Sequence, residues 1–249
     1  MQFIPLKSPV IKQGDFWQKL SKLIKGRLSS GDILVIASKL IALEQDDLAV
    51  KDEIKPTTRA KKLANNFKID PRFVQVVLKQ ADKIIGGVKG TLLTVKDSVV
   101  IANAGVDHSN APKGYFILWP KKPEAMADKI KRFVQKECKK RIGVIIADSH
   151  CLPRRLGTSG LALAISGFEG VVDQRKQKDL YGRPLKITYS NLADDLAAAS
   201  AVLMGEAAEK VPLVIIKKPP VTLSNSSAKV LTNKLKIKRE ACLFYQSDL

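Results

Sequence analysis

Cysteine is scarce in this chain of 249 residues, and long apolar runs are absent. The three cysteines, Cys138, Cys151 and Cys242, are too few and too scattered for a disulfide framework or a zinc motif. This usage fits a reducing compartment, and the first residues lack the apolar core of a signal peptide, so we expect a cytoplasmic protein. No apolar run approaches the roughly 18 residues that a membrane helix needs, so we expect no membrane partner.

Aromatic and acidic residues are also few. Phe, Trp and Tyr make up 6% of the chain, which leaves little material for stacking bases, and no RNA- or DNA-recognition motif is present. The 43 Lys and Arg residues outnumber the 24 Asp and Glu residues, which gives a formal charge of +19. Such a surface favours anionic partners, including nucleotides, phosphorylated metabolites and nucleic acid. Charge alone does not choose among them, so a basic nucleic-acid-binding protein is one alternative.

The common nucleotide-binding and hydrolase motifs are missing. The sequence contains no Gly-x-x-x-x-Gly-Lys-Ser/Thr loop, no Gly-x-Gly-x-x-Gly and no Ser nucleophile elbow. A hydrophobic content of 45% is ordinary for a globular protein and excludes a chain that is disordered throughout.

Short apolar runs alternate with one-faced amphipathic segments, which predicts an α+β or mixed α/β fold. Asp70-Pro71 indicates a helix start, with Asp as the cap and Pro in the first turn, and Asn191 is a cap of the same kind. We expect one domain over 1–222, either single or made of two interleaved subdomains, and a basic C-terminal tail over 223–249. Strands are predicted over 2–6, 33–37, 92–95, 99–102, 143–147 and 211–216, and helices after Asp15, from 56, from 71, over 123–140 and 192–204, and weakly over 230–237.

Two of the predicted strands end next to an aspartate. The strand 99–102 leads through Gly105 to Asp107, and the strand 143–147 ends at Asp148. Carboxylate oxygens are the ligands that Mg²⁺ and Mn²⁺ prefer, so the two side chains predict a shared metal site. The alternative is that both aspartates only cap turns. His108 and His150 follow these aspartates and either ligate the ion, hold a ligand in place or face the solvent.

Basic residues after the second aspartate are candidates for phosphate contacts. Arg155 is the best of them, because it follows the 148–150 loop most closely, and we assign it a catalytic role. The others are expected to be surface charges: Arg154, Arg175, Lys176, Lys178 and Arg183.

Several longer segments, in this order along the chain, resemble the coenzyme F-420 γ-glutamyl ligases, which add glutamate to a deazaflavin coenzyme precursor. The resemblance covers roughly residues 11–216. The segments are Gly-Asp-Ile-Leu-Val-Ile-Ala-Ser at 31–38, Asn-Ala-Gly-Val-Asp-His-Ser-Asn at 103–110, Gly-Val-Ile-Ile-Ala-Asp-Ser at 143–149, Asp-Leu-Tyr-Gly-Arg at 179–183, and Ala-Asp-Asp-Leu-Ala-Ala-Ala with Leu-Met-Gly-Glu between 193 and 206.

The resemblance implies a GTP-dependent ligation that uses two divalent ions, Mg²⁺ or Mn²⁺, and leaves room for a monovalent cation. The γ-phosphoryl group moves to the acceptor carboxylate, and the glutamate amine attacks the resulting acyl phosphate. Asp107 and Asp148 match the first metal position of the family, and Ser149 and Glu206 match the second. The family more often has Thr at the place of Ser149, and the hydroxyl survives that change. Two ions would neutralise the phosphoryl oxygens and align the reacting groups.

The resemblance also implies which residues contact the nucleotide: Ser38, Lys39, Asn110, and Met204, Gly205 and Val211 within the segment 204–211. It implies a fold of the family's own type and an intertwined homodimer. Three nucleotide-contacting features of the family are altered. Leu6-Lys7-Ser8-Pro9 stands where the family has Glu-Gly-Leu-Pro, Leu43 replaces a lysine, and Ala207-Ala208-Glu209-Lys210 replaces a glycine-rich segment.

Three functions are therefore compared. The first is a nucleotide-driven ligase that joins L-glutamate to a small carboxylate acceptor, of which the deazaflavin precursor is one. The second is a nucleic-acid-binding protein on the same scaffold. The third is a metal-dependent nucleotidase or phosphatase, in which the same ions activate water.

Overall fold

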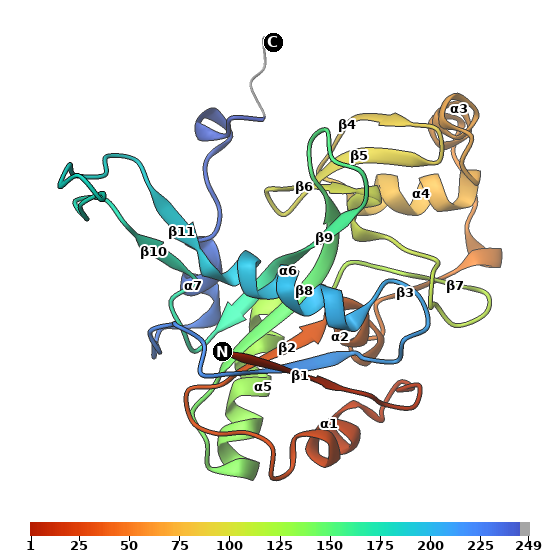
Figure 1. Ribbon diagram of the computed structural model, residues 1–249. Coiled ribbons are helices and arrows are strands. Elements are labelled where there is room, and N and C mark those ends of the chain that lie inside the picture. Colours follow the sequence, from red (N-terminus) through yellow and green to blue (C-terminus); the bar gives the residue numbers. More distant parts are fainter. Residues whose placement is uncertain (245–249) are drawn as a thin grey trace.

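A five-stranded mixed sheet lies at the centre of the structure, which is a computed structural model describing residues 1–244 (Figure 1). The strands β2 and β8 run parallel, and every other neighbouring pair is antiparallel. In order across the sheet the strands are β1 (Gln2–Leu6), β12 (Leu213–Lys217), β2 (Ile33–Ala37), β8 (Gly143–Cys151) and β9 (Thr158–Ser166).

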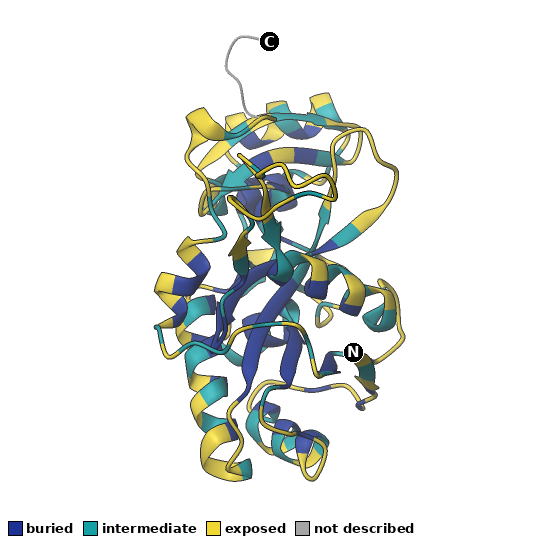
Figure 2. Ribbon diagram, turned by 60° about the vertical axis from the view of Figure 1, so that its left-hand side comes forward, coloured by how far each residue is buried: buried dark blue, intermediate teal, exposed yellow. Residues whose placement is uncertain are grey.

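Helices cover both faces of this sheet, which explains why its central strands are apolar throughout. Leu34 and Ile36 of β2 face α1 (Phe16–Ile24) and α5 (Pro123–Cys138), whereas Ile33 and Val35 face α6 (Leu192–Met204) and α7 (Ala228–Asn233). The helix α2 (Ser38–Glu44) follows β2 without a connecting loop. Figure 2 shows these strands as the most buried part of the molecule.

A second, smaller lobe is formed by residues 48–118, between α2 and α5 in the chain. It has its own core, in which Phe73, Val77, Leu92 and Phe116 are buried, and it lies to one side of the sheet (Figure 1). Its elements are β3 (Leu48–Val50), η1 (Lys51–Glu53), α3 (Thr58–Phe67), α4 (Pro71–Gln80), β4 (Lys83–Val88), β5 (Thr91–Lys96), β6 (Val99–Ala102), η2 (Asn103–Gly105) and β7 (Tyr115–Ile117).

A two-stranded ribbon and the C-terminal segment complete the described chain. The ribbon, β10 (Val171–Asp173) and β11 (Tyr189–Asn191), projects from the sheet in Figure 1. In the segment predicted as a basic tail, α7 buries Leu231 against the sheet, and η3 (Arg239–Ala241) follows. The last part of that prediction, 245–249, lies outside the described residues.

Most elements predicted from apolar patterns are present, and the mixed α and β class is confirmed. Asp70 caps α4 by accepting from the N–H of Arg72, and Asn191 caps α6 by accepting from that of Asp194. Asp15 precedes α1 but its side chain caps nothing, since it pairs with Lys19 at 3.2 Å. None of the helices within residues 1–244 is long and apolar enough to cross a membrane.

The boundary predicted after residue 147 is wrong, because β8 continues to Cys151. No strand is predicted over 157–170, a segment rich in small residues, yet it supplies β9, which pairs with β8 from Val144↔Ser166 to Cys151↔Thr158. Asp148 therefore lies within a strand, opposite Leu161, and is held by a paired backbone.

Gly160 of β9 packs directly against the backbone of α6. A Cβ atom there would collide with the backbone of Ala197, and backbone cannot move aside as a side chain can. We expect Gly160→Ala to lower the free energy of unfolding by about 1–3 kcal/mol, measured by urea denaturation. Gly86→Ala is the matched control, because a Cβ at Gly86 meets no atom within 4 Å. Equal stability of the two variants would contradict this packing.

Candidate functional site

Two neighbouring cavities share one wall of polar residues. The first cavity, of about 460 Å³, lies between the sheet and the smaller lobe. The second cavity, of about 390 Å³, lies between α2, the end of α6 and the loop after β1. Five residues line both cavities: Ser38, Lys39, Asp148, Ser149 and Glu206. Three of the four predicted metal ligands therefore belong to the shared wall, and the fourth, Asp107, lines the first cavity.

The register of the sheet places Asp148 beside the start of α2. Ala147 pairs with Ala37, so Asp148 and Ser38 follow side by side. Burial raises the pKa of Asp148 to about 6, and the nearby Asp107 adds to this. The pKa is lowered by hydrogen bonds from the Ser149 backbone and the Ser38 side chain and by the charge of Lys39. These effects are smaller than the effect of burial, so the pKa remains raised. The negative charge at Asp148 is thus incompletely neutralised by its surroundings.

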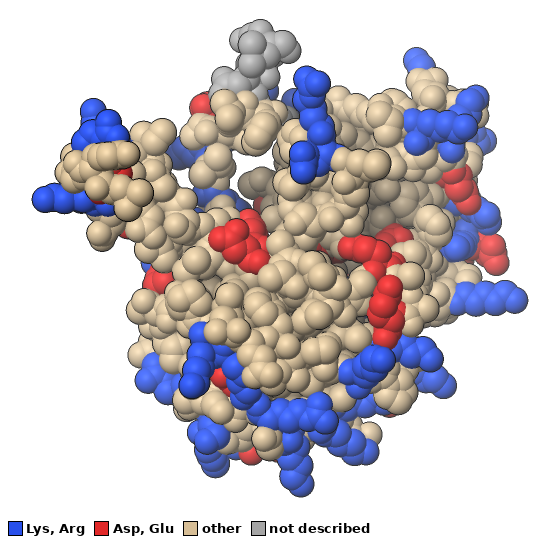
Figure 3. Space-filling view, in the orientation of Figure 1, with Lys and Arg blue, Asp and Glu red and all other residues tan. Residues whose placement is uncertain are grey.

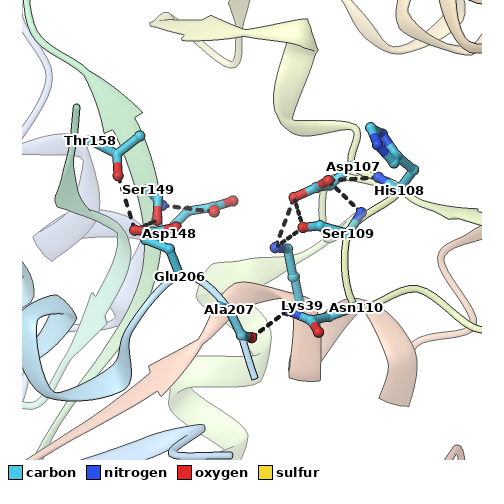
Figure 4. Close-up of polar contacts among 10 residues, drawn as sticks. All are labelled: Lys39, Asp107, His108, Ser109, Asn110, Asp148, Ser149, Thr158, Glu206 and Ala207. Carbon is cyan, nitrogen blue, oxygen red and sulfur yellow. Dashed lines mark hydrogen bonds and ion pairs between the residues drawn. The ribbon is translucent and has the colours of Figure 1, made fainter. Parts of the chain in front are cut away.

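Glu206 joins the same wall from the end of α6. The helix ends at Gly205, whose φ of 72° turns the chain back toward β8. Ser149 Oγ donates to Glu206 Oε1 at 2.7 Å, and Thr158 Oγ1 donates to the same oxygen at 3.0 Å (Figure 4). Two adjacent strands and one helix end thus bring a carboxylate and two hydroxyls to one point.

Asp107 stands across from this group and is held by its own loop. The N–H groups of His108 and Ser109 donate to its Oδ1 at 2.6 and 2.7 Å, and Lys39 Nζ lies 2.7 Å from its Oδ2. Burial alone would raise the pKa of Asp107, but the bonds from Lys39 and Ser109 outweigh it and lower that pKa. The two aspartates therefore differ in charge compensation, although the sequence presents them alike.

The loop before Asp107 depends on Gly105, as the sequence suggested. Gly105 has a φ of 70°, and a Cβ there would collide with the ring of Trp119. Asp107 exchanges two backbone hydrogen bonds with Ile117, of 2.9 and 2.8 Å, which fasten the loop to β7. The carboxylate is thereby aimed at Lys39 in Figure 4.

The donor chemistry of the wall suits a hard cation. Asp148, Ser149, Glu206 and Thr158 offer only oxygen, which favours Mg²⁺ or Mn²⁺ over softer ions. A divalent ion would supply the charge that Asp148 lacks. Within residues 1–244, however, no three His, Cys, Asp or Glu side chains converge as one metal-binding group. Asp107 has Lys39 against its carboxylate (Figure 4).

All six residues predicted to contact a nucleotide line the second cavity: Ser38, Lys39, Asn110, Met204, Gly205 and Val211. Asn110 Nδ2 donates to the carbonyl of Ala207 at 2.9 Å and so ties the two sides of the cavity together. The altered family positions Ser8, Leu43, Ala207 and Ala208 line the same cavity. The departures in sequence thus converge on one place rather than being scattered.

The structure does not bring Arg155 to either cavity. Arg155 is exposed in the turn between β8 and β9, where its N–H donates to the carbonyl of Leu152 at 3.2 Å. Its catalytic role stays a prediction. His108 and His150 line the first cavity. The His108 ring packs edge-on against Phe73, and Nδ1 of His150 lies at hydrogen-bond distance from the Ser159 carbonyl.

Two residues of the site were missed. Ser109 bonds to both Lys39 and Asp107, and Thr158 bonds to Glu206. Ser109 stands inside the segment 103–110 that carries the resemblance, so attention to its hydroxyl could have found it. Thr158 gave no signal, because its place in the site depends on the pairing of β9 with β8.

Comparison with known proteins gives consistent matches over most of the chain. The family model described as F420-0:Gamma-glutamyl ligase matches residues 5–218. A protein named coenzyme F420:L-glutamate ligase from Methanocaldococcus jannaschii is 39% identical over 232 residues, which is 93% of each chain. A protein of the same name from Methanococcus maripaludis strain C6 is 36% identical over 94% of each chain. Another, from Methanopyrus kandleri, is 38% identical over 86% of this chain and 84% of the relative.

The raised pKa of Asp148 predicts a pH-dependent stability of the metal-free protein. Below the ordinary pKa of 3.8 the Asp148 carboxyl is protonated in both the native and the unfolded chain. Between pH 3.8 and about 6 it keeps its proton only in the native state. The group's contribution to stability is therefore lost as pH rises through about 6. We expect Asp148→Asn to be more stable than the wild type by about 1–3 kcal/mol at pH 7 in EDTA, and equally stable near pH 4. Urea denaturation measures this, and parallel pH profiles would contradict it.

Proposed function

The chain belongs to the F420-0:gamma-glutamyl ligase family and is a ligase, and from this premise we propose that it joins L-glutamate to a deazaflavin coenzyme precursor. The proposal takes its substrates from the printed names of the relatives, which are coenzyme F420:L-glutamate ligases. Membership favours this function over the nucleic-acid-binding and nucleotidase alternatives. In the view of Figure 3, moreover, Lys and Arg are spread around the outline of the molecule, whereas several acidic side chains gather near its middle.

The observation that carries the proposal is the wall shared by the two cavities. A ligation that passes through an acyl phosphate needs two binding places that meet at the phosphoryl group being transferred. We assign the nucleotide, GTP in this proposal, to the second cavity and the acceptor to the first. The wall between them holds Ser38, Lys39, Asp148, Ser149 and Glu206, which are the groups that suit a transferring phosphate and its cations.

The lining of the first cavity supports its assignment to a flat, anionic acceptor. Phe73 and Phe116 form an aromatic floor, with ring centroids 5.2 Å apart. Lys51 Nζ lies 4.7 Å from the centroid of the Phe116 ring and brings a positive charge to that side. An apolar floor beside one cation suits a ring system that carries acidic groups.

In the proposed reaction, an acceptor carboxylate oxygen attacks the γ-phosphorus and the nucleoside diphosphate leaves. The glutamate amine then attacks the acyl carbon, phosphate leaves, and the amine loses a proton. Bound Mg²⁺ or Mn²⁺ would neutralise the phosphoryl oxygens. Asp148, Glu206 and the Ser149 hydroxyl would hold such an ion, and Lys39 would pair with phosphate oxygens. Asn110 would keep the segment after Gly205 closed over the nucleotide through its bond to Ala207.

Mass spectrometry of the reaction products tests this function. Incubation with Mg²⁺ or Mn²⁺, GTP, L-glutamate and the deazaflavin precursor is expected to give a product heavier by one or more glutamyl residues. ATP in a parallel reaction tests the altered second cavity.

Glu206→Gln is expected to lower the rate at least 100-fold and to weaken Mn²⁺ binding, because it removes the charge that faces Ser149 and Thr158.

Glu137→Gln is the matched control, because Glu137 is exposed on α5 and lines neither cavity. Nucleotide hydrolysis that proceeds equally well without glutamate or the precursor would reject the ligase function and favour the nucleotidase.

We further propose that the chain works as a homodimer joined through the β10–β11 ribbon. The family resemblance implies the dimer, and exposed apolar side chains in the segment 174–188, which joins β10 to β11, support it. Leu180 and Tyr181 are 100% and 84% exposed, and Ile187 is 87% exposed. Leu156, in the β8–β9 turn, is exposed as well. Apolar groups gathered on a projecting element favour a protein partner.

Light scattering coupled to size-exclusion chromatography tests the dimer. The wild type is expected to elute with twice the mass of one chain, and the double variant Leu180→Asp with Ile187→Asp is expected to elute as a monomer, because charges oppose burial of this surface. Val88→Asp is the control, since Val88 is 70% exposed on β4 of the smaller lobe. A wild type that elutes as a monomer at micromolar concentration would overturn the proposal.

A further inference from the structure

Lys39 forms an ion pair with Asp107 that the metal and nucleotide assignments leave unexplained. We propose that Lys39 is a positioning residue that keeps Asp107 closed to a divalent cation in the nucleotide-free protein, and that it releases Asp107 when a polyphosphate enters the second cavity. The inference rests on the proposed function for the presence of both ligands. It adds a coupling between them that the functional assignment does not require.

The contacts of Lys39 show what closes Asp107. Lys39 Nζ lies 2.7 Å from Asp107 Oδ2 and donates to Ser109 Oγ at 3.1 Å. Ser109 Oγ in turn donates to the same Asp107 oxygen at 2.9 Å (Figure 4). The two N–H groups of His108 and Ser109 take the other oxygen, Oδ1. Both carboxylate oxygens therefore have donors, and one donor is a full positive charge.

A cation cannot share Asp107 with this ammonium group. Mg²⁺ binds carboxylate oxygen at about 2.0–2.1 Å, so an ion on Oδ2 would lie within a few ångströms of the lysine nitrogen. Repulsion between the two charges in a partly buried place then excludes one of them. The side chains of Lys39 and Asp107 are 31% and 35% exposed, so the solvent screens this repulsion only in part. An ion can reach Asp107 once Lys39 has moved.

The other half of the wall has no such block. Among residues 1–244, no Lys or Arg side chain forms an ion pair with Asp148 or Glu206, and the neighbours of Glu206 are hydroxyls. A first cation can therefore bind at Asp148, Ser149 and Glu206 without breaking an ion pair. The two halves of the site differ in that Lys39 forms an ion pair with Asp107, whereas it acts on Asp148 only through its charge.

The second cavity supplies a reason for Lys39 to move. Lys39 lines both cavities, so its ammonium group can turn from Asp107 toward an anion in the second cavity. Phosphate oxygens replace the carboxylate as its partner, and Ser109 Oγ remains with Asp107. The nucleotide thus opens the place of the second cation. By linkage, the second cation must then strengthen nucleotide binding by the same factor.

Manganese titration followed by electron paramagnetic resonance tests the coupling, with Mn²⁺ and a non-hydrolysable GTP analogue as the probes. The wild type is expected to bind one Mn²⁺ tightly without the analogue and two with it. Lys39→Met is expected to bind two without the analogue, with the affinity of the second site raised at least tenfold. An unchanged or weaker second site in Lys39→Met would overturn the proposal, as would two tight sites in the nucleotide-free wild type.

Matched variants separate the effect of the Lys39–Asp107 ion pair from the effect of removing any positive charge. Lys113→Met removes a positive charge from an exposed residue of the loop after Asn110 that lines neither cavity, and it is expected to behave as the wild type. An equal gain in Lys113→Met would overturn the proposal. Lys39→Arg is expected to keep the second site closed, and Asp107→Asn is expected to lose it with or without the analogue. If Lys39→Met fails to fold, Lys39→Gln removes the same positive charge from Asp107, and an unchanged second site in that variant would overturn the proposal.

The measurement also separates this inference from the proposed function. It follows ion binding and involves neither glutamate nor acceptor. Loss of coupling with intact ligation would reject the role of Lys39 alone. Intact coupling in a protein that ligates nothing would reject the ligase function and leave the role of Lys39 standing.

Discussion

The parallel pairing of β2 with β8 is the constraint on which the site depends. Its register sets Ala37 beside Ala147, so the chain enters α2 at Ser38 where β8 presents Asp148 and Ser149. Ile33 to Ile36 of β2 and residues 143–147 of β8 are buried, and a slip of one residue would turn every side chain to the opposite face. The packing of the sheet thereby holds the polar wall in place, although the wall itself contributes little apolar contact.

Charge is distributed unevenly over this wall, and that distribution gives the site its chemistry. Asp148 is half-buried, forms no ion pair within residues 1–244 and holds its proton more tightly than usual, whereas Asp107 is paired with Lys39 and hydrogen-bonded by its own loop. A carboxylate that lacks a partner attracts an ion, and one that has a lysine partner must exchange it. Two aspartates that look alike in sequence can therefore play successive parts in assembling one site.

The elements that could be predicted from the sequence are those that depend on residues close to one another in the chain. Apolar runs located β1, β2, β8 and β12, and Asp70 and Asn191 located two helix starts, because strand burial and capping depend on neighbouring residues. The ordered segments around Asp107, Asp148 and Glu206 indicated the family. The alanine- and glycine-rich segment of β9 escaped, since its strand conformation comes from pairing with β8.

The sequence by itself determined the mixed α and β class, the family and the residue types of the site, since each is carried by short-range spacing. Only the tertiary structure decided how those residues meet. It placed Thr158 on Glu206, left Arg155 exposed away from both cavities, gathered the altered nucleotide positions around one cavity and set Lys39 against Asp107. These pairs are separated by up to about seventy residues, and a distance across space is set by sheet register and packing, which no local pattern encodes.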